Sequence, residues 1–150
     1  MRLTRYSDYA MRVLIHLSAH NERLGSIGEI SRVYGISQNH LMKVVHDLGK
    51  AGFIITVRGR NGGIRLARPP EQINLGEVIR HTEQDFELAD CGNCIIMPAC
   101  GLTSVLDEAV RAFLRVFESY TLADAMQNKR RLARLFELRT VSQITREAAE

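Results

Sequence analysis

The chain has 150 residues, of which 45% are hydrophobic and 25% are charged, a composition typical of a globular protein and not of a disordered one. No apolar run approaches the ~18 residues that a membrane span requires, and the N-terminus lacks the hydrophobic stretch and cleavage site of a secretion signal. We therefore expect a cytoplasmic protein with no membrane partner.

The net charge of +3 is distributed unevenly along the chain. Residues 1–68 carry 11 lysines and arginines against 4 acidic residues, a net charge of +7, whereas residues 69–150 carry 9 against 13, a net charge of −4. Positive charge concentrated in one part of a chain is typical of proteins that bind polyanions such as DNA. The two halves are therefore expected to have different roles.

Three helices are predicted in the first 50 residues. The first runs to about Ala19, because its apolar residues recur at helical spacing. The second begins after Ser26, which with Glu29 has the pattern of a capping box, and it ends near Gly35. Ser37 is placed to cap the third. The inward-facing residues are expected to be Ala10, Val13, Leu14 and Leu17 in the first helix, and Leu41, Val44, Val45 and Leu48 in the third.

The second and third of these helices, joined by a tight turn at a glycine, have the arrangement of a helix-turn-helix. In this motif the N-terminal residues of the second helix of the pair reach base edges in the major groove. Amide side chains suit that task because they can donate to adenine and accept from it at once. The candidate DNA-binding residues on this helix are Gln38, Asn39, His40 and Lys43.

The following segment, FIITVRGRNGGIRLARPP, predicts a β-hairpin, because alternating and β-branched residues flank a glycine-rich tip. Asn61, Gly62 and Gly63 are expected to supply the positive backbone angles of a tight turn. Arg58 and Arg60 on this wing are candidate DNA contacts. Each feature alone also fits a solvated surface, but their joint occurrence in the basic half indicates a winged DNA-binding domain.

The second half predicts a short helix within INLGEVIRHTEQ, residues 73–84, then a cysteine-containing loop and a long helix. The apolar seam of the long helix consists of Leu102, Leu106, Ala109, Phe113, Val116 or Phe117, and Tyr120. We expect this seam to pair with a second copy and form a homodimer that reads a palindromic operator, although it could instead pack on its own domain.

The expected fold is therefore mainly α-helical with a small β-hairpin wing, a winged helix-turn-helix followed by a long dimerisation helix. The predicted divisions are a DNA-binding domain at 1–80, a cluster-binding loop at 81–101, a dimerisation region at 102–126 and a tail at 127–150 with no assigned function.

All three cysteines lie in the stretch DCGNCIIMPACG. Two residues separate Cys91 from Cys94, and five separate Cys94 from Cys100. Clustered cysteines in a reducing compartment more often indicate metal or redox chemistry than structural disulfides. Three thiolates suit zinc or an iron–sulfur cluster and do not suit magnesium or calcium. A fourth ligand must then come from outside the loop.

Four interpretations of the cysteines remain open. A structural zinc site could be closed by His81, two thiols could form a disulfide switch, or the cysteines could simply be buried and unligated. An iron–sulfur cluster is favoured, because a solvent-accessible cluster with an incomplete thiolate set is labile and can respond to oxidants or gases. The sequence contains no recognisable catalytic constellation, so we expect no enzyme.

Several stretches resemble one family of proteins: the opening MRLTRYSDYAMRVL, the helix pair GEISRVYGISQNHLMKVVHDLGKAGFI, the wing VRGRNGGIRL, the cysteine loop, and SYTLADAM. Over residues 1 to about 126 the chain is similar to the winged-helix iron–sulfur regulators. The stretches YGISQNHLMKVV, VRGRNGGIRLARP, IMPACGL and YTLADAM look most like the nitric-oxide-sensing branch of this family. The resemblance implies a homodimeric repressor that loses its operator when nitric oxide attacks the cluster.

The same resemblance implies one cluster per subunit, expected to be 4Fe–4S rather than 2Fe–2S, and a fourth ligand at Asp8 from the first helix of the partner subunit. The alternative is that Asp8 is an acidic residue that stabilises a helix N-terminus. The gap of two residues between the first two cysteines is more compact than in other members, which leaves nuclearity and effector open. The alternatives are a regulator that senses iron or cluster supply, a metal-free thiol regulator, and an iron–sulfur electron carrier.

Overall fold

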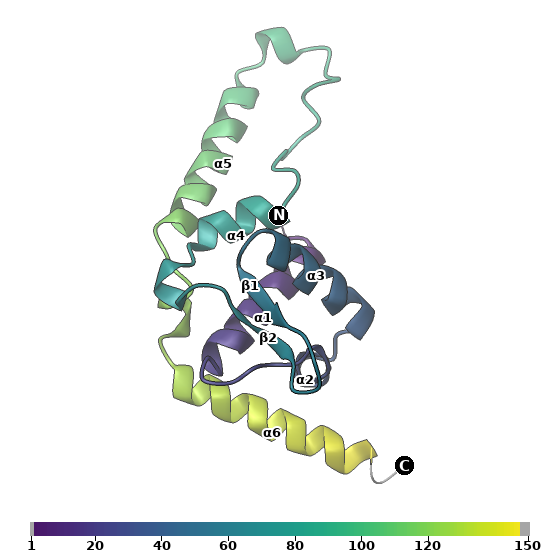
Figure 1. The fold of residues 1–150 in the computed structure, drawn as a ribbon. Coiled ribbons are helices and arrows are strands. Elements are labelled where there is room, and N and C mark those ends of the chain that lie inside the picture. The colour runs from purple at the N-terminus through teal and green to yellow at the C-terminus, as the bar shows by residue number, and fades with distance from the viewer. Residues whose placement is uncertain (1, 148–150) are drawn as a thin grey trace.

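The computed structural model describes residues 2–147 and places the side chains of residues 2–139, so the last three residues of the predicted tail lie outside the described chain. The helices are α1 (Arg5–Ala19), α2 (Ile27–Tyr34), α3 (Gln38–Lys50), α4 (Leu75–Thr82), α5 (Leu102–Glu118) and α6 (Lys129–Glu147), and the antiparallel strands are β1 (Ile54–Val57) and β2 (Gly63–Leu66). Short 3-10 turns cover Pro70–Gln72, Met97–Ala99 and Asp124–Met126. The predicted mainly helical fold with one hairpin is confirmed (Figure 1).

Local sequence accounts for most helix boundaries in this fold. Thr4, Ser26 and Asn74 accept hydrogen bonds from backbone N–H groups in the first turns of α1, α2 and α4. α2 ends at Gly35, whose φ of 65° is the left-handed conformation that glycine adopts without strain. Ser37 stands at the start of α3, as predicted, but its side chain makes no capping hydrogen bond.

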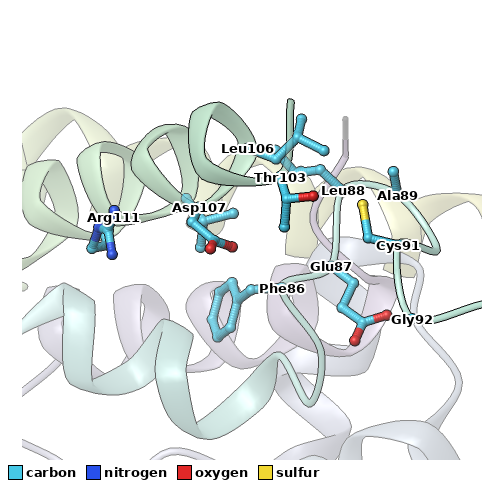
Figure 2. Close-up of a pocket in the computed structure, with 11 residues that line it drawn as sticks. Phe86, Glu87, Leu88, Ala89, Cys91, Gly92, Thr103, Leu106, Asp107 and Arg111 are labelled. Atoms are coloured by element: carbon cyan, nitrogen blue, oxygen red, sulfur yellow. The ribbon is translucent and has the colours of Figure 1, made fainter. Parts of the chain in front are cut away.

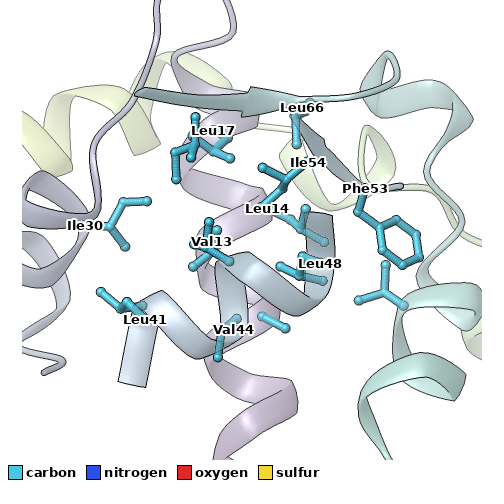
Figure 3. Close-up of a cluster of buried hydrophobic side chains, with 14 of the residues drawn as sticks. Val13, Leu14, Leu17, Ile30, Leu41, Val44, Leu48, Phe53, Ile54 and Leu66 are labelled. Atoms are coloured by element: carbon cyan, nitrogen blue, oxygen red, sulfur yellow. The ribbon is translucent and has the colours of Figure 1, made fainter. Parts of the chain in front are cut away.

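The core of the winged head lies between α1, α3 and the hairpin, with α2 and α4 closing its sides (Figure 3). The inward-facing set predicted from helical periodicity is confirmed, because all eight of those residues are buried. Phe53, Ile54 and Leu66 add the hairpin's contribution to the same cluster. This packing holds α3 against α1 with its other face exposed.

The hairpin tip does not obtain its turn in the way that the sequence predicts. The positive φ angle in this tip belongs to Gly59, at 110°, and not to Asn61, Gly62 or Gly63. That expectation was wrong because Val57 pairs with Gly63, so Gly63 already belongs to β2 and the turn spans residues 59–62, where the N–H of Gly62 donates to the carbonyl oxygen of Gly59 at 3.0 Å. Gly62 is required for a different reason: a Cβ at this position would clash with the carbonyl oxygen of Val57.

The capping box predicted at the start of α2 is only half formed. Ser26 accepts a hydrogen bond from the backbone N–H of Glu29 at 3.1 Å, but the Glu29 carboxylate instead pairs with Arg23. It also lies 3.4 Å from the Nε2 atom of His16, which is fully buried. These two neighbours, His16 first and then Arg23, lower the pKa of Glu29.

Helix α5 projects from the head together with the preceding loop (Figure 1). Its C-terminal end is fixed to α4, where Asn74 Nδ2 donates to the carbonyl oxygen of Glu118 at 2.7 Å and Arg80 forms an ion pair with the Glu118 carboxylate. Leu114 is the buried residue of this helix. The cysteine loop and α5, together called the arm below, are therefore fixed to α4 at the C-terminal end of α5.

The seam predicted on α5 separates into two faces. Leu106, Phe113 and Phe117 are partly buried within the same chain, so the alternative that they pack on their own domain applies to them. The exposed face also has alternating steps of three and four. It consists of Leu102, Val105, Ala109, Ala112 and Val116, and these residues are all exposed.

Helix α6 folds back onto the head, which periodicity did not predict. Phe136, 8% exposed, packs in a second small cluster with Ala19, Val33 and Met126. Its ring centroid lies 5.0 Å from that of His16. The tail thereby covers the outer sides of α1 and α2.

Phe136→Ala is expected to lower the free energy of unfolding by about 3 kcal/mol, because it leaves a cavity where a buried aromatic ring packs. Urea denaturation measures this change. Leu135→Ala on the same helix is the matched control, since Leu135 is 49% exposed and its truncation should cost under about 1 kcal/mol. Equal effects of the two variants would show that α6 does not contribute to the folded core.

Candidate cluster site and nucleic-acid interface

The four residues predicted to read DNA lie together on the first turns of α3. Gln38, Asn39, His40 and Lys43 are all exposed. The buried side of the same helix is held by Leu41, Val44, Val45 and Leu48. The geometry presents a polar helix end to solvent from a rigid core, which is the arrangement that a recognition helix requires.

The two wing arginines also lie where the sequence placed them. Arg58 and Arg60 are exposed and follow the end of β1 at the hairpin tip. Arg68, farther along the hairpin, is 3.3 Å from the Glu77 carboxylate on α4, so its charge is partly compensated. Two exposed cations at this tip, for which the described part of the chain shows no ion pair, are suited to phosphate contacts beside a groove.

The cysteine loop consists of short turns. The backbone N–H of Cys94 donates to the carbonyl oxygen of Cys91 at 3.2 Å, and the N–H of Cys100 donates to that of Met97 at 3.2 Å. All three cysteines are unpaired; Cys94 is exposed, and Cys91 and Cys100 are partly exposed. Buried, inert cysteines are thereby excluded for this loop. Within the described part of the chain, however, no three His, Cys, Asp or Glu side chains converge as a metal site.

A pocket of about 450 Å³ lies between the loop and α5. Figure 2 shows Cys91 on the loop across from Thr103 on the helix. The Oγ1 atom of Thr103 is buried, and no hydrogen-bond partner is found for it among the described residues. An orphaned hydroxyl beside a thiol is a donor available to a thiolate or a sulfide ligand. The donor set of three soft thiols and this hydroxyl therefore fits an iron–sulfur cluster in its chemistry.

Asp8 lies in the first turn of α1 and is not gathered with the cysteines in this protomer. Its Oδ1 atom accepts a hydrogen bond from Arg12 Nε at 2.9 Å, and both side chains are about half exposed. An exposed pair of this kind contributes little to stability. Asp8 is therefore accessible to a partner subunit.

A polar network that no sequence pattern predicted ties the base of the loop to α1. At the end of α4, Ser7 Oγ donates to Thr82 Oγ1 at 2.8 Å in a buried contact. One residue later, Glu83 Oε1 accepts from the backbone N–H of Thr4 at 2.7 Å. The chain enters the cysteine loop directly after these contacts. The start of the loop and the N-terminal turn of α1 therefore form one rigid unit.

A second contact ties the same end of α4 to the recognition helix. The Nε2 atom of His81 lies 2.9 Å from the Oδ2 atom of Asp47 on α3, and the hydroxyl of Tyr6 donates to that oxygen at 2.7 Å. His81, considered above as a zinc ligand, thus has a partner away from the cysteines. The bond from Tyr6, and to a lesser degree that from His81, lowers the pKa of Asp47.

Tyr6→Phe is expected to raise the pKa of Asp47 towards its ordinary value and to cost about 1 kcal/mol of stability at neutral pH. A depressed carboxyl pKa stabilises the fold above the unfolded-state value of about 4 and loses this effect as the pH falls through the folded-state value. The variant should therefore lose less stability than the wild type on acidification. NMR titration of Asp47 and urea denaturation at several pH values measure both effects, and an unchanged Asp47 titration would contradict the prediction.

A family model described as "Rrf2: Iron-dependent Transcriptional regulator" matches residues 3–128 of the chain. The chain belongs to the Rrf2 family. Two relatives described as "HTH-type transcriptional regulator NsrR" agree with this membership. The one from Bacillus licheniformis is 52% identical over 141 residues, covering 90% of this chain and 99% of the relative. The one from Bacillus subtilis is 48% identical over 145 residues, covering 93% and 99%.

Solved structures of Rrf2-like proteins share the fold. A structure described as "T. potens IscR" has a TM-score of 0.71 and 27% identity, and the match covers 85% of this chain and 88% of that one. The oxidized form of Staphylococcus aureus CymR has a TM-score of 0.68 and 26% identity, over 81% and 93%. The predicted winged-helix fold is therefore confirmed by experimental structures.

Membership in the Rrf2 family confirms the prediction of a transcriptional regulator rather than an enzyme. The family description also supports a dependence on iron, whereas it does not specify the kind of iron centre. Within the residues that the structure describes, no helix combines the length and apolar character that crossing a membrane requires.

Proposed function

We propose that this Rrf2 protein is a homodimeric repressor that binds a palindromic operator and responds to nitric oxide through an iron–sulfur cluster. The observation that carries the proposal is the set of three unpaired thiols on one exposed loop, which begins at the polar contacts to α1 and α3. The similarity to two NsrR regulators supports nitric oxide as the effector. As a protein that binds DNA, it would act in the cytoplasm.

Cys91, Cys94 and Cys100 would hold the cluster, with Asp8 of the partner subunit as the fourth ligand. The cluster would be of the 4Fe–4S type, which takes four protein ligands, here three thiolates from one chain and one carboxylate from the other. When bound, it would supply iron that reacts with nitric oxide. The accessibility of the Asp8 carboxylate supports its part in this set.

Operator binding would use the exposed start of α3 and the wing. Gln38 and Asn39 have the amide groups that read base edges, His40 follows them directly, and Lys43 lies about one turn farther along the helix. Arg58 and Arg60 would contact phosphate. The division of the chain into a winged head, a cluster loop, a dimer helix and a tail, at the boundaries expected above, is part of this proposal.

The dimer would form along the exposed face of α5. A face of apolar residues at alternating steps of three and four suits pairing with an identical helix about a twofold axis. This helix is anchored to α4, and the start of α3 is exposed in the protomer, so pairing along α5 would leave the recognition helix free for DNA. Two heads held by one pair of helices would match two half-sites of an operator.

The loop would influence DNA binding through the contacts at its base. Ser7 and Thr82 link the loop entry to α1, and His81 and Asp47 link it to the recognition helix. A change in loop conformation would thus be transmitted through hydrogen bonds of 2.8 and 2.9 Å to both elements. Through these contacts the cysteine loop would influence α3, which lies outside the loop.

A metal-free thiol regulator is the second candidate function. It is favoured by the lack of convergence of the three thiols within the described chain and by the likeness to a structure described as an oxidized form of CymR. It predicts that operator binding changes with thiol oxidation in protein free of iron. A regulator of iron or cluster supply would instead respond to iron depletion and not to nitric oxide.

Anaerobic reconstitution followed by operator-binding assays tests the proposal. Native mass spectrometry should report a dimer with iron and sulfide in each subunit, and nitric oxide should release the operator. Protein that binds only zinc, or whose operator affinity ignores nitric oxide, would contradict the proposed function.

A further inference from the structure

The charge of the chain reverses sharply at the start of α6. Residues 69–128 carry 3 basic and 10 acidic residues, a net charge of −7. Residues 129–139, the part of α6 whose side chains are described, carry 5 basic residues and 1 acidic residue, a net charge of +4. The helix thus matches the basic winged head in charge and differs from the arm that precedes it.

The position of α6 agrees with its charge. Its first residue, Lys129, donates from Nζ to Asn21 Oδ1 at 2.9 Å, in the turn between α1 and α2. Glu137, the acidic residue of this part of α6, lies near Arg23 in the same turn. Glu29 raises the pKa of Arg23 most, and the charge of Glu137 raises it further. Figure 1 shows α6 crossing the head beside α2. The only negative charge on this part of the helix is therefore offset by the head itself.

The arginines of α6 lie away from the packed side of the helix. Phe136 is buried and Leu132 is partly buried against the head. Arg130, Arg131 and Arg134 are exposed on the other side, with Arg130 and Arg134 four residues apart and one turn from each other. Three guanidinium groups on one exposed face form a surface suited to bidentate contacts with phosphate.

We propose that this exposed face of α6 is an additional DNA-binding surface that contacts the phosphate backbone next to the helix-turn-helix. The proposal rests on the proposed function, because it requires that the head binds DNA. α6 packs on α2, and α2 packs on the recognition helix α3, so docking α3 in a major groove brings α6 near the flanking backbone. The surface adds affinity without sequence preference, since phosphate is the same at every base pair.

Two exposed leucines, Leu135 and Leu138, lie on the same helix and would suit a protein partner. DNA is the better occupant, because positive charge dominates the face and continues the basic charge of the head. A protein partner would depend on the leucines and would leave the salt dependence of operator binding unchanged. The salt dependence of operator binding therefore distinguishes DNA from a protein partner on this face.

The test is the salt dependence of operator affinity for the Arg130→Gln/Arg134→Gln variant of the full-length, reconstituted protein. The slope of log affinity against log salt concentration should fall by about 2 for each arginine, because a dimer carries each contact twice and each contributes about 0.9. Affinity near physiological salt should fall at least about tenfold, equally for operator and unrelated DNA. Arg130→Lys/Arg134→Lys should retain most of the slope, because it keeps the charges.

Arg115→Gln is the matched control, since Arg115 is an exposed arginine on α5 in the acidic part of the chain, and it should leave the slope unchanged. A wild-type slope in the Arg130→Gln/Arg134→Gln variant would overturn the inference while the proposed function stands. So would a loss of affinity confined to the operator, or one produced equally by Leu135→Ser. A wild-type protein without salt-sensitive operator binding would overturn the proposed function itself.

Discussion

Replacing Cys94 by alanine is expected to reduce the iron and sulfide content of anaerobically reconstituted protein to less than about a tenth of the wild-type content. Cys94 is exposed and lies between the other two cysteines in the sequence. Without it only two thiolates, those of Cys91 and Cys100, remain, and two thiolates are too few to hold a cluster. Operator affinity should fall by about 10- to 100-fold, which lies within the range typical of coupling between two sites of one protein. Absorption spectroscopy, metal analysis and operator-shift assays measure these effects.

Met97→Leu is the matched control for this experiment. Met97 lies in the same loop and is 44% exposed, and leucine keeps its size and apolar character without sulfur. Cluster content and operator affinity should therefore remain at wild-type levels. A Cys94→Ala protein that retains full iron and sulfide would exclude the three-thiol site, whereas one that loses iron but keeps nitric-oxide-sensitive operator binding would exclude the cluster as the sensor.

Replacing Val105 by glutamate should dissociate the dimer. Val105 is 58% exposed in the protomer and lies in the middle of the exposed apolar face of α5, so the substitution does not disturb the folded monomer. Pairing of two identical helices would then bury two unpaired carboxylates, each of which costs several kcal/mol. The dimer dissociation constant should rise by about 100-fold or more. Operator affinity should fall with it, because one head binds only one half-site.

Arg115→Glu introduces the same side chain on the polar side of α5 and should leave the dimer intact. Analytical ultracentrifugation measures the dissociation constant of both variants, and circular dichroism verifies their helix content. A Val105→Glu protein that remains dimeric at the same concentrations as the wild type would place the subunit interface elsewhere. The reason to assign Asp8 to the partner's cluster would then be lost.

The sequence alone determined the elements of the head with good accuracy. Helix periodicity, the cap at Ser26 and the glycine at 35 are local features, because each depends on residues within one or two turns of the chain. The exposed set on α3 followed from the same periodicity. The spacing of Cys91, Cys94 and Cys100, and the motifs shared with a known family, likewise required no tertiary information.

The rules for caps and turns failed where a group outside the helix or turn interacted with the residue concerned. Glu29 was expected to cap α2, but its carboxylate pairs with Arg23 and faces His16, because a charged partner binds a carboxylate more strongly than a backbone N–H does. At the hairpin tip, the approach of the Val57 carbonyl determines where glycine is needed. Neither effect can be read from spacing.

Only the tertiary structure decided how the cysteine loop joins the winged head. Ser7 and Thr82 are separated by 75 residues, and Asp47 and His81 by 34, so no periodicity relates them. It also showed which side of α5 remains exposed and that α6 returns to the head, where Phe136 buries its ring. Local patterns thus specified the parts of this protein, whereas packing of residues far apart in the chain determined which parts can act on one another.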